Sequence, residues 1–269
     1  MNAVSELEED AALETSMQAP LKRDLVAGLE KGLAVIRAFD QEHARLTISQ
    51  VAERTHLTRA AARRYLLTLM HLGFVSQDRK MFVLTPKVLL LSQSYLHSAR
   101  LPRIVEPELS KLAVSFKEAS AVCVLEGNDV VIVAAASASR LPVPNLQPGK
   151  RVPAHCTPAG RVLLAALPPE QSDAWLAMQD LSAYTPQTIT QPERLRAEIA
   201  HARAQGYACT DQEFTQGVRT IAVPLKNHRG DVVAALSLCV QAAHMSMEEM
   251  LERTLQPLLL TQAHLKMLL

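Results

Sequence analysis

The sequence predicts an α+β protein in which an N-terminal winged helix-turn-helix precedes a larger domain of mixed helices and strands. Three observations support this fold class. Residues 48–84 combine two short helical patterns with two apolar runs around a polar turn. Positive charge is concentrated in the same part of the chain. Beyond residue 120, apolar runs typical of strands alternate with segments typical of helices.

Length and composition favour two domains in a globular protein. The chain has 269 residues, of which 48% are hydrophobic and 20% charged, so there is enough apolar material for substantial cores. No apolar run approaches the roughly 20 residues that a membrane-spanning helix needs. The acidic N-terminal segment lacks the basic and then apolar pattern of a signal peptide. We therefore expect a disordered acidic tail over residues 1–25 and a cytoplasmic protein without a membrane partner.

The net charge of +1 conceals an uneven distribution. Residues 1–21 carry five acidic side chains and no basic one, residues 22–100 carry 13 Lys and Arg against 6 Asp and Glu, and the remainder carries 15 against 16. An excess of positive charge confined to one segment is typical of a module that neutralises phosphates, although a basic surface can also be only a solvated face.

The four cysteines indicate neither a metal site nor a disulfide framework. They are widely spaced and form no CxxC pair, at Cys123, Cys156, Cys209 and Cys239. Structural zinc sites need closely spaced pairs of ligands. Scattered buried thiols in a reducing compartment explain this pattern, so we expect no metal and no cofactor.

The elements of the first domain follow from helix caps and apolar spacing. Apolar side chains keep a helical period over Val26–Phe39. Thr47 is placed as the N-cap of a short helix, and Thr58 as the N-cap of a second one that runs from Arg59 to about Leu72. Gly73 then occupies the position at which helices commonly end. This order is typical of a helix-turn-helix.

A wing and a connecting helix follow. Phe74–Ser76 and Met81–Leu84 are short apolar strands around the polar turn Gln77–Lys80. The segment Pro86–Ser98 begins with a proline suited to a first helical turn, and it is too rich in leucine to stand alone in water. The predicted domains are the winged domain at 26–85, a linker helix at 86–100 and the second domain at 101–269.

The second domain begins with a helix that ends near Lys117 and then becomes rich in strands. The predicted strands are, in order, Ala121–Glu126, Val130–Ala136, Gly206–Thr210, Arg219–Leu225 and Val232–Val240. The predicted helices are Arg161–Ala166, Glu170–Met178, Pro192–Gln205 and a final helix capped by Ser246. Gly127-Asn128-Asp129 between the first two strands is a hairpin signal.

The second helix of the helix-turn-helix has two faces. By helical spacing the inner face holds Ala62, Tyr65, Leu66, Leu69 and Met70, and the outer face holds Arg59, Ala60, Arg63, Arg64 and Leu67. Arg59 and Arg63 can pair bidentately with guanine or clamp phosphate. The predicted DNA-binding residues are Thr47, Thr58, Arg59, Ala60, Arg63, Arg64, Arg79 and Lys80. The alternative, an amphipathic surface helix in an interaction domain, explains the charges but not the ordered caps, helices and wing.

Several motifs resemble the IclR family of bacterial transcriptional regulators. In the first domain they are Gly28–Phe39, Leu46–Ala52, Leu57–Leu69 and Gly73-Phe74-Val75. In the second domain they are Leu146–Ala165 and Gly206–Pro224. The run Arg-Ala-Ala-Ala-Arg-Arg in the third motif looks most like the PcaR/PobR/PcaU branch, whose members control aromatic-acid catabolism. Several separate motifs in the right order make the resemblance specific.

The resemblance implies a fold and a set of partners. The family's fold is an N-terminal winged helix, a linker helix and a C-terminal α/β effector-binding domain of GAF-like type. The expected partners are double-stranded operator DNA and a small carboxylic acid, either an aromatic acid or a ring-cleavage product. Members form homodimers, often dimers of dimers, and the leucine-rich linker helix independently favours a partner surface. A two-fold dimer reads two half-sites separated by whole helical turns.

The resemblance also implies an effector pocket in the second domain. Its expected residues are Val152, His155, Pro158, Ala159, Thr210, Asp211, Val218, Thr220, Ser237 and Cys239. Backbone N–H groups at the start of the helix around Gly160 favour a carboxylate. Alternation along a strand places Ser237 and Cys239 on one face. Arg161 or Arg219 could add positive charge, and His155 could equally serve packing.

Two other functions compete with ligand-responsive regulation of transcription. An enzyme could use Cys156, His155 and Asp211 as nucleophile, base and orienting group, but adjacent residues seldom face each other and no activation motif surrounds Cys156. An architectural DNA-binding protein that ignores small molecules is the third function. We predict a regulator with no enzymatic activity and no catalytic residues.

Overall fold

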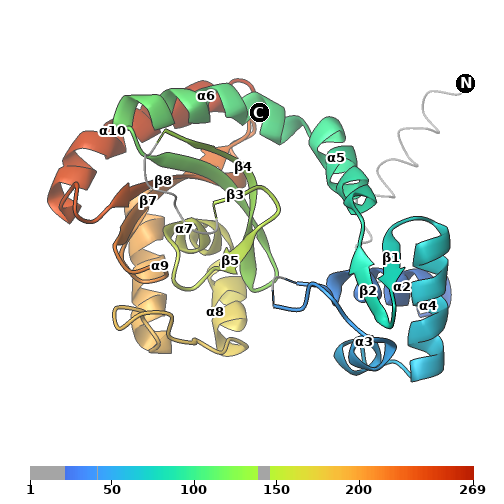
Figure 1. The fold of residues 1–269 in the computed structure, drawn as a ribbon. Helices are drawn as coiled ribbons and strands as arrows, with labels where there is room; N and C mark the ends of the chain where they lie inside the picture. The colour runs from blue at the N-terminus through green and yellow to red at the C-terminus, as the bar shows by residue number, and fades with distance from the viewer. Residues whose placement is uncertain (1–21, 41, 139–145) are drawn as a thin grey trace, which may run out of the picture. The chain divides into compact units, whose positions relative to one another are not determined.

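The computed structural model describes residues 22–40, 42–138 and 146–269, and they fold into two compact units that divide between Leu91 and Ser92 (Figure 1). The predicted acidic tail, 1–25, lies outside the described residues except for its last four. The division falls inside the helix that the sequence predicts as a linker, so the predicted linker contributes to both units. Each unit has its own buried core.

The first unit is a winged helix-turn-helix. Its elements are η1 (Lys22–Asp24), α2 (Ala27–Arg37), α3 (Ile48–Arg54), α4 (Arg59–His71), β1 (Val75–Asp78), β2 (Met81–Leu84), η2 (Pro86–Val88) and the start of α5 (Leu89–Ser98). Strands β1 and β2 pair antiparallel. Backbone hydrogen bonds between Leu46 and Phe82 attach the segment before α3 to the wing.

Both predicted helix caps are confirmed. The Thr47 side chain accepts from the Gln50 N–H at 3.3 Å, and the Gln50 side chain accepts from the Thr47 N–H at 2.9 Å, which together form a capping box. The Thr58 hydroxyl accepts from Ala61 N at 3.2 Å. Each cap satisfies a backbone donor that the first helical turn leaves unpaired, so the caps fix where α3 and α4 begin.

Helix α4 ends as predicted at a left-handed glycine. Gly73 has φ +80°, and its N–H donates to Met70 O at 3.0 Å while the Phe74 N–H donates to Leu69 O at 2.8 Å. These two bonds are the Schellman arrangement, which satisfies carbonyls at the helix end. The chain therefore turns directly from α4 into the wing.

The two predicted faces of α4 are largely confirmed. Ala62, Leu66 and Leu69 are buried against α2, α3 and the wing. Met70, placed on the inner face by spacing, is instead exposed. It lies in the last turn of α4, where the chain bends away at Gly73. The wing turn is also shorter than predicted, because Asp78 pairs with Met81 in the ladder.

The turn between α3 and α4 contains a residue in a strained conformation. His56 is exposed and has φ +54°, a left-handed value that costs a side chain about 1–2 kcal/mol. Glycine removes this cost, but it loses more backbone conformational entropy on folding, which costs about 0.5–1 kcal/mol. We expect His56→Gly to raise the free energy of unfolding by up to about 1 kcal/mol, measured by urea denaturation of the full chain.

A matched control is available in the next helix. His71 is also an exposed histidine, but it lies in the last turn of α4 with ordinary helical backbone. His71→Gly is expected to lower stability by about 0.5–1 kcal/mol. Equal destabilisation by both substitutions would show that the turn at His56 carries no left-handed strain.

The second unit is an α/β domain built on one antiparallel sheet. Its elements are α6 (Arg100–Phe116), β3 (Ala119–Glu126), β4 (Asp129–Ser137), β5 (Arg151–Pro153), α7 (Pro158–Ala166), α8 (Pro169–Ala177), α9 (Pro192–Gln205), β6 (Ala208–Asp211), β7 (Val218–Lys226), β8 (Val232–Gln241) and α10 (Met247–Lys266). The strand order is β5-β4-β3-β8-β7-β6. Strand β5 pairs with β4 at the edge and is absent from the sequence prediction, because three residues carry too little alternation to indicate a strand.

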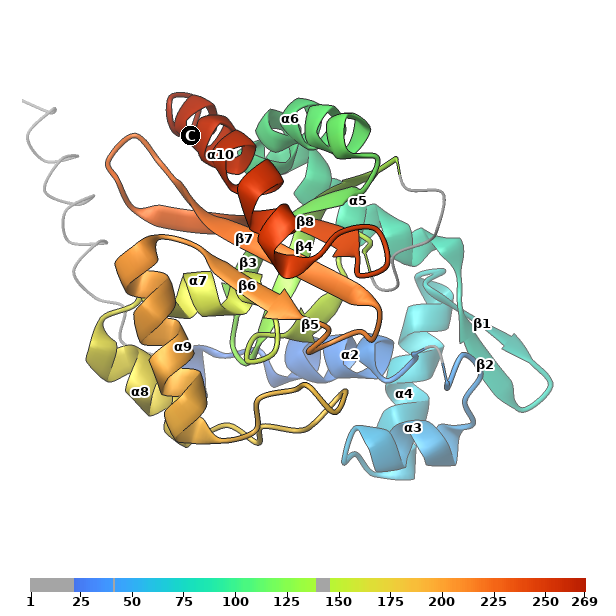
Figure 2. The same cartoon turned by 90° about the vertical axis from the view of Figure 1, so that its left-hand side faces the viewer.

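Helices cover both faces of this sheet (Figure 2). Helices α6 and α10 pack on one face around Leu109, Leu236 and Leu258. Helix α7 packs on the other face, with α9 and α8 beyond it, around Leu164 and Leu195. The predicted fold class is therefore confirmed: an N-terminal winged helix-turn-helix followed by a C-terminal α/β domain. None of the described helices combines the length and the apolar character needed to cross a bilayer.

Candidate functional site

The outer face of α4 presents unpaired positive charge. Arg59, Arg63 and Arg64 are exposed, and within the described residues their guanidinium groups make neither a hydrogen bond nor an ion pair. Ala60 lies exposed beside them. Free guanidinium groups on the N-terminal part of a second helix are available to base edges and phosphates.

Other arginines of the same unit are already used by the fold. Arg45 forms an ion pair with Asp78 of the wing. Arg54 donates to Ala38 O at 2.9 Å and pairs with Asp40 at 2.5 Å. This contrast separates the arginines that hold the unit together from those that α4 leaves free for a partner.

The other predicted DNA-binding residues lie near helix starts and at the wing tip. The Thr47 hydroxyl donates to the Gln50 side chain, so it serves the cap of α3. The Thr58 hydroxyl only accepts a bond, which leaves its own proton available to a phosphate oxygen. Arg79 and Lys80 form the exposed two-residue turn between β1 and β2. All eight remain predicted contacts.

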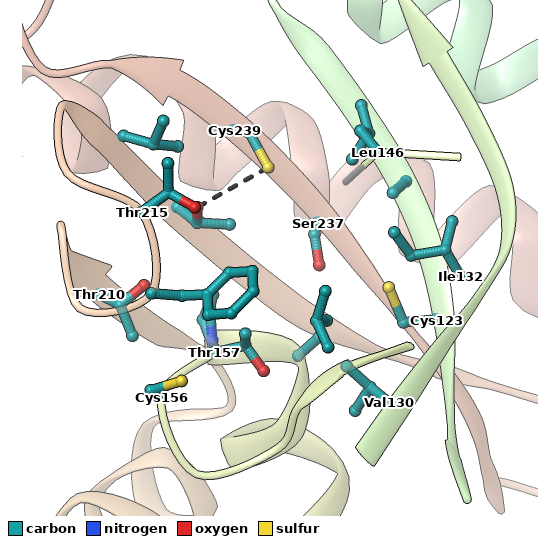
Figure 3. A pocket seen from close by; sticks show the side chains of 17 residues that line it. Cys123, Val130, Ile132, Leu146, Cys156, Thr157, Thr210, Thr215, Ser237 and Cys239 are labelled. Carbon is teal, nitrogen blue, oxygen red and sulfur yellow. Dashed lines mark hydrogen bonds between the residues drawn. The ribbon is translucent and has the colours of Figure 1, made fainter. Parts of the chain in front are cut away.

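The second unit contains a pocket between α7, the sheet and the segment 212–217 (Figure 3). Its empty space is about 620 Å³ when the open mouth is included. The lining residues are Ala121, Cys123, Val130, Ile132, Leu146, Val152, Cys156, Thr157, Pro158, Ala159, Thr210, Phe214, Thr215, Val218, Thr220, Ser237 and Cys239. Hydroxyls and thiols are its polar groups, set in a mainly apolar wall.

Eight of the ten predicted effector residues line this pocket. They are Val152, Pro158, Ala159, Thr210, Val218, Thr220, Ser237 and Cys239. They come from five elements and loops that are distant in sequence, and the fold brings them together. Ser237 and Cys239 share a face of β8, as the strand alternation predicted.

His155 and Asp211 lie outside the lining. The His155 ring nitrogen Nε2 is 3.0 Å from Ser182 O, and the ring packs against Tyr184, which in turn contacts Phe214 of the pocket edge-on. Burial lowers the pKa of His155, which favours the neutral form of the ring. Asp211 points to the other side of its strand, where it pairs with Arg219 at 2.9 Å. His155 therefore supports the pocket wall indirectly, through Tyr184 and Phe214.

The two arginines suggested as ligand charges also lie outside the lining. Arg161 is buried, with 1% of its side chain exposed, and pairs with Glu213. Arg219 donates to Ala242 O and Met245 O as well as to Asp211. Both guanidinium groups are used to hold loops, and sequence could not show this because each partner lies elsewhere in the chain.

Ser237 places a fully buried hydroxyl without a partner in the pocket. The residue is 4% exposed, and its Oγ makes no hydrogen bond among the described residues. Figure 3 shows this hydroxyl directed into the space between the Cys156–Thr157 side and the Ile132 side. Neighbouring Thr220 instead donates to Cys239 Sγ at 3.7 Å. A buried unpaired hydroxyl is costly, so a polar ligand atom at this point would gain from it.

The start of α7 supplies a backbone donor at another wall of the pocket. Thr157 caps the helix by accepting from Gly160 N at 3.3 Å. The helix begins at Pro158, three residues earlier than predicted, because proline at the first position gives up only a donor that has no helical partner. Ala159 follows, and its N–H is the free donor of the first turn, because Pro158 has no N–H and the Gly160 N–H is paired with Thr157. This donor and the helix dipole favour an anion.

The pocket thiols are protonated and are not arranged for catalysis. Burial raises the pKa of Cys156 to about 12 and that of Cys239 to about 11. Cys156 Sγ contacts Pro153 O at 4.0 Å rather than His155, whose ring bonds to Ser182. The arrangement lacks the nucleophile and base pairing that the enzyme hypothesis requires.

Sequence reasoning missed part of the lining. Ala121 and Cys123 of β3 enter the pocket because β3 pairs with β8, where Ala121 lies opposite Ser237. Phe214 and Thr215 enter from the segment after β6. The motif Gly206–Pro224 contains Phe214 and Thr215 and was the available signal for them, whereas the β3–β8 register leaves no local trace in the sequence.

Together these two parts define a class of protein, a transcriptional regulator with a DNA-reading module and a separate ligand-sized pocket. The chain belongs to the IclR family of bacterial transcriptional regulators. Residues 28–79 match the IclR helix-turn-helix domain, and residues 93–265 match the bacterial transcriptional regulator IclR C-terminal domain. The resemblance found in the sequence is confirmed, and the family is one of regulators rather than enzymes.

Similar proteins with known roles cover most of the chain. A Pca regulon regulatory protein of Pseudomonas putida is 41% identical over 88% of this chain and 81% of its own length. A Pca operon regulatory protein of Acinetobacter baylyi is 36% identical over 94% and 93%. The p-hydroxybenzoate hydroxylase transcriptional activator of the same organism is 37% identical over 90% of each chain.

Solved structures agree with the fold. A protein from Rhodococcus sp. RHA1 is 42% identical with a TM-score of 0.78, covering 90% of this chain and 97% of its own. The inducer-binding domain of the PobR transcription factor from Acinetobacter, solved as a double mutant with 3-hydroxybenzoic acid, is 29% identical with a TM-score of 0.61. It covers 64% of this chain and all of its own.

Proposed function

We propose that this cytoplasmic regulator controls an operon of aromatic-acid catabolism and is switched by a small aromatic carboxylic acid in the pocket of the second unit. The relatives named for the Pca regulon and p-hydroxybenzoate hydroxylase support the kind of operon. The bound 3-hydroxybenzoic acid of the PobR domain supports the kind of ligand. The observation that carries the proposal is the buried, unpartnered Ser237 hydroxyl that faces an apolar pocket.

The chemistry of the walls supports an orientation for such a ligand. A carboxylate fits the start of α7 at Ala159, because the free Ala159 N–H and the helix dipole favour negative charge there. An aromatic ring fits between Ile132 and Val218, and a hydroxyl or second polar atom fits against Ser237. A ring-cleavage acid is the second candidate ligand.

Calorimetric titration of the full chain tests the proposal. The panel is benzoate, 3-hydroxybenzoate, 4-hydroxybenzoate, 3,4-dihydroxybenzoate and open-chain dicarboxylates. A second assay measures whether each acid changes the affinity of the protein for promoter DNA. We expect binding of at least one aromatic acid and an altered DNA affinity. Absence of heat with every acid, together with unchanged DNA binding, would favour the architectural alternative.

Ser237→Ala isolates the hydroxyl that carries the proposal. We expect about a tenfold weaker affinity for the best hydroxybenzoate, the effect of one lost hydrogen bond. Stability should stay unchanged or rise, because the free protein leaves this hydroxyl unpaired. Ser120→Ala is the control, since the Ser120 hydroxyl lies on the other face of the sheet and donates to Leu109 O at 2.8 Å. Ser120→Ala should lower stability without altering affinity for the acid. If Ser237→Ala instead lowers stability and leaves that affinity unchanged, Ser237 is a structural residue.

The proposed assembly is a homodimer or a dimer of dimers. Large apolar side chains are exposed on the first unit, with Leu29 64%, Leu33 47% and Leu89 62% accessible. A second copy is the partner that suits a helix-turn-helix, because a two-fold pair reads two half-sites. Sedimentation equilibrium of the full chain distinguishes a dimer, a tetramer and the monomer that would contradict this assembly.

A further inference from the structure

A buried cation lies directly behind the effector pocket. Arg161 of α7 has 1% of its side chain exposed, and its Nη2 donates to Glu213 Oε2 at 2.5 Å. The Glu213 side chain is itself only 8% exposed. Arg161 Nη1 also donates to Cys209 O at 3.3 Å and lies 3.6 Å from Glu198 of α9. The pair thus joins elements that are 52 residues apart in the chain.

Helix α7 and the two segments to which Arg161 donates hydrogen bonds each contribute a nearby residue to the pocket. On α7, Ala159 lines the pocket two residues before Arg161. On β6, Thr210 follows Cys209 and lines it as well. In the segment after β6, Phe214 follows Glu213 and forms another part of the wall. The same cation therefore connects three walls of one cavity without entering it.

Stability alone does not account for this arrangement. Removing two charges from water is costly, and a well-packed apolar pair of similar volume is often as stable as a buried ion pair. Burial raises the pKa of Glu213 although Arg161 opposes that rise, which shows how strongly the site is desolvated. What the ion pair supplies is a fixed geometry, because its atoms must keep their partners.

Other hydrogen bonds also hold the segment 212–217, but among the described residues none of them reaches α7. The Thr185 hydroxyl donates to Gln212 O at 2.7 Å, and the Thr188 hydroxyl donates to Glu213 O at 2.6 Å. These bonds hold the backbone to the loop before α9, not to α7. The Ala242 N–H donates to Gly217 O at 2.8 Å. The Arg161–Glu213 pair is thus the polar link, among the described contacts, between this segment and the helix on the opposite side of the pocket.

We infer that Arg161 and Glu213 are positioning residues that fix the Phe214–Thr215 wall against α7 and so set the width of the effector pocket. The effect on ligands rests on the proposed function, whereas the positioning of the wall does not. Without the pair, the wall moves outward. The pocket then binds a well-fitting acid more weakly and distinguishes less between acids of different width.

The test uses a double variant that removes both charges while keeping their volume, Arg161→Met with Glu213→Gln. Arg161→Met alone leaves a buried unpaired carboxylate and is expected to fold poorly, so it is not the informative variant. The control is the exposed pair of α8 and α9, Asp173 and Arg196, joined at 2.8 Å. Arg196→Met with Asp173→Asn makes the same chemical change away from the pocket.

The first measurement is hydrogen exchange of the full chain without ligand. In the double variant we expect faster exchange at Gln212 and Val218, whose amides close the segment by donating to Val218 O and Thr215 O. Exchange in the sheet and the unfolding curve from Trp175 fluorescence should match the control variant. Unchanged exchange in the segment, or a uniform increase over the whole unit, would overturn the positioning role.

The second measurement is the Kd for 3-hydroxybenzoate, 4-hydroxybenzoate and benzoate. In the double variant we expect the Kd of the tightest-binding acid to rise about tenfold, an effect similar to the loss of one hydrogen bond. We also expect the Kd values of the three acids to differ less from one another. Arg161→Lys, which keeps the cation, should recover part of the affinity. Equal affinities in wild type and double variant would overturn the inference. If wild type binds none of the acids while local exchange still rises, the proposed function fails and the positioning role stands.

Discussion

Gly160→Ala is expected to lower the free energy of unfolding of the second unit by about 3 kcal/mol or more, at the upper end of the overpacking range. A Cβ built on Gly160 would overlap the backbone O, Cα and C atoms of Ala154, closer than real Cβ atoms approach. Helix propensity alone predicts the opposite sign, because alanine favours a helix by about 1 kcal/mol over glycine. Backbone overlap outweighs propensity, since a backbone carbonyl cannot rotate away as a side chain can.

The same substitution should also abolish effector binding in any fraction that folds. Gly160 lies in the first turn of α7, next to Ala159, so relief of the overlap must move the helix start away from the Ala154 backbone. That movement displaces the Ala159 N–H in the wall of the pocket. Binding of hydroxybenzoates, followed by calorimetry at a temperature where the variant remains folded, is expected to fall below detection.

Trp175 provides the measurement. It is the only tryptophan of the chain, it is buried in the second unit, and its indole donates to Gly127 O at 2.9 Å. Its fluorescence therefore reports unfolding of this unit. Gly32→Ala is the control, because Gly32 is also helical and a Cβ there would meet only Tyr65 at 4.0 Å, an ordinary contact. Circular dichroism should show this variant unchanged or stabilised, and similar losses in both variants would contradict the overlap argument.

Local signals in the sequence explain why the first unit could be predicted closely. Thr47, Thr58 and Gly73 act within a few residues of their own positions, as caps and as a left-handed stop. Apolar spacing then identifies the buried face of α4. The exception, Met70, fails because its environment depends on where the chain turns after the helix.

The pocket could be predicted only in part, because it depends on contacts between distant segments. Motif resemblance located Ser237 and Thr220 without showing what lies opposite them. The register between β3 and β8, which brings in Ala121, is set by the whole sheet. The partner of Arg161 is 52 residues away, so its charge looked available to a ligand when it is in fact committed to Glu213.

Arg59→Ala and Arg63→Ala are each expected to weaken binding to an operator, selected from random duplexes by the wild-type protein, by about 1–3 kcal/mol. Both side chains lie one helical turn apart on the outer face of α4, and neither has a partner within the described residues that it would lose on binding DNA. Bidentate pairing with guanine explains an effect of this size. The first turn of a second helix is also the part that such folds place against base edges.

Binding to operator variants separates base reading from phosphate contact. If Arg63 pairs with a guanine, Arg63→Ala should abolish the penalty for changing that one base pair and leave the other positions unaffected. A phosphate contact would instead weaken binding to every sequence alike and reduce its salt dependence. Arg45→Ala serves as the control, because it removes the same charge from a residue that the wing residue Asp78 already holds. A loss for Arg63→Ala no larger than that for Arg45→Ala would assign α4 an electrostatic role without base reading.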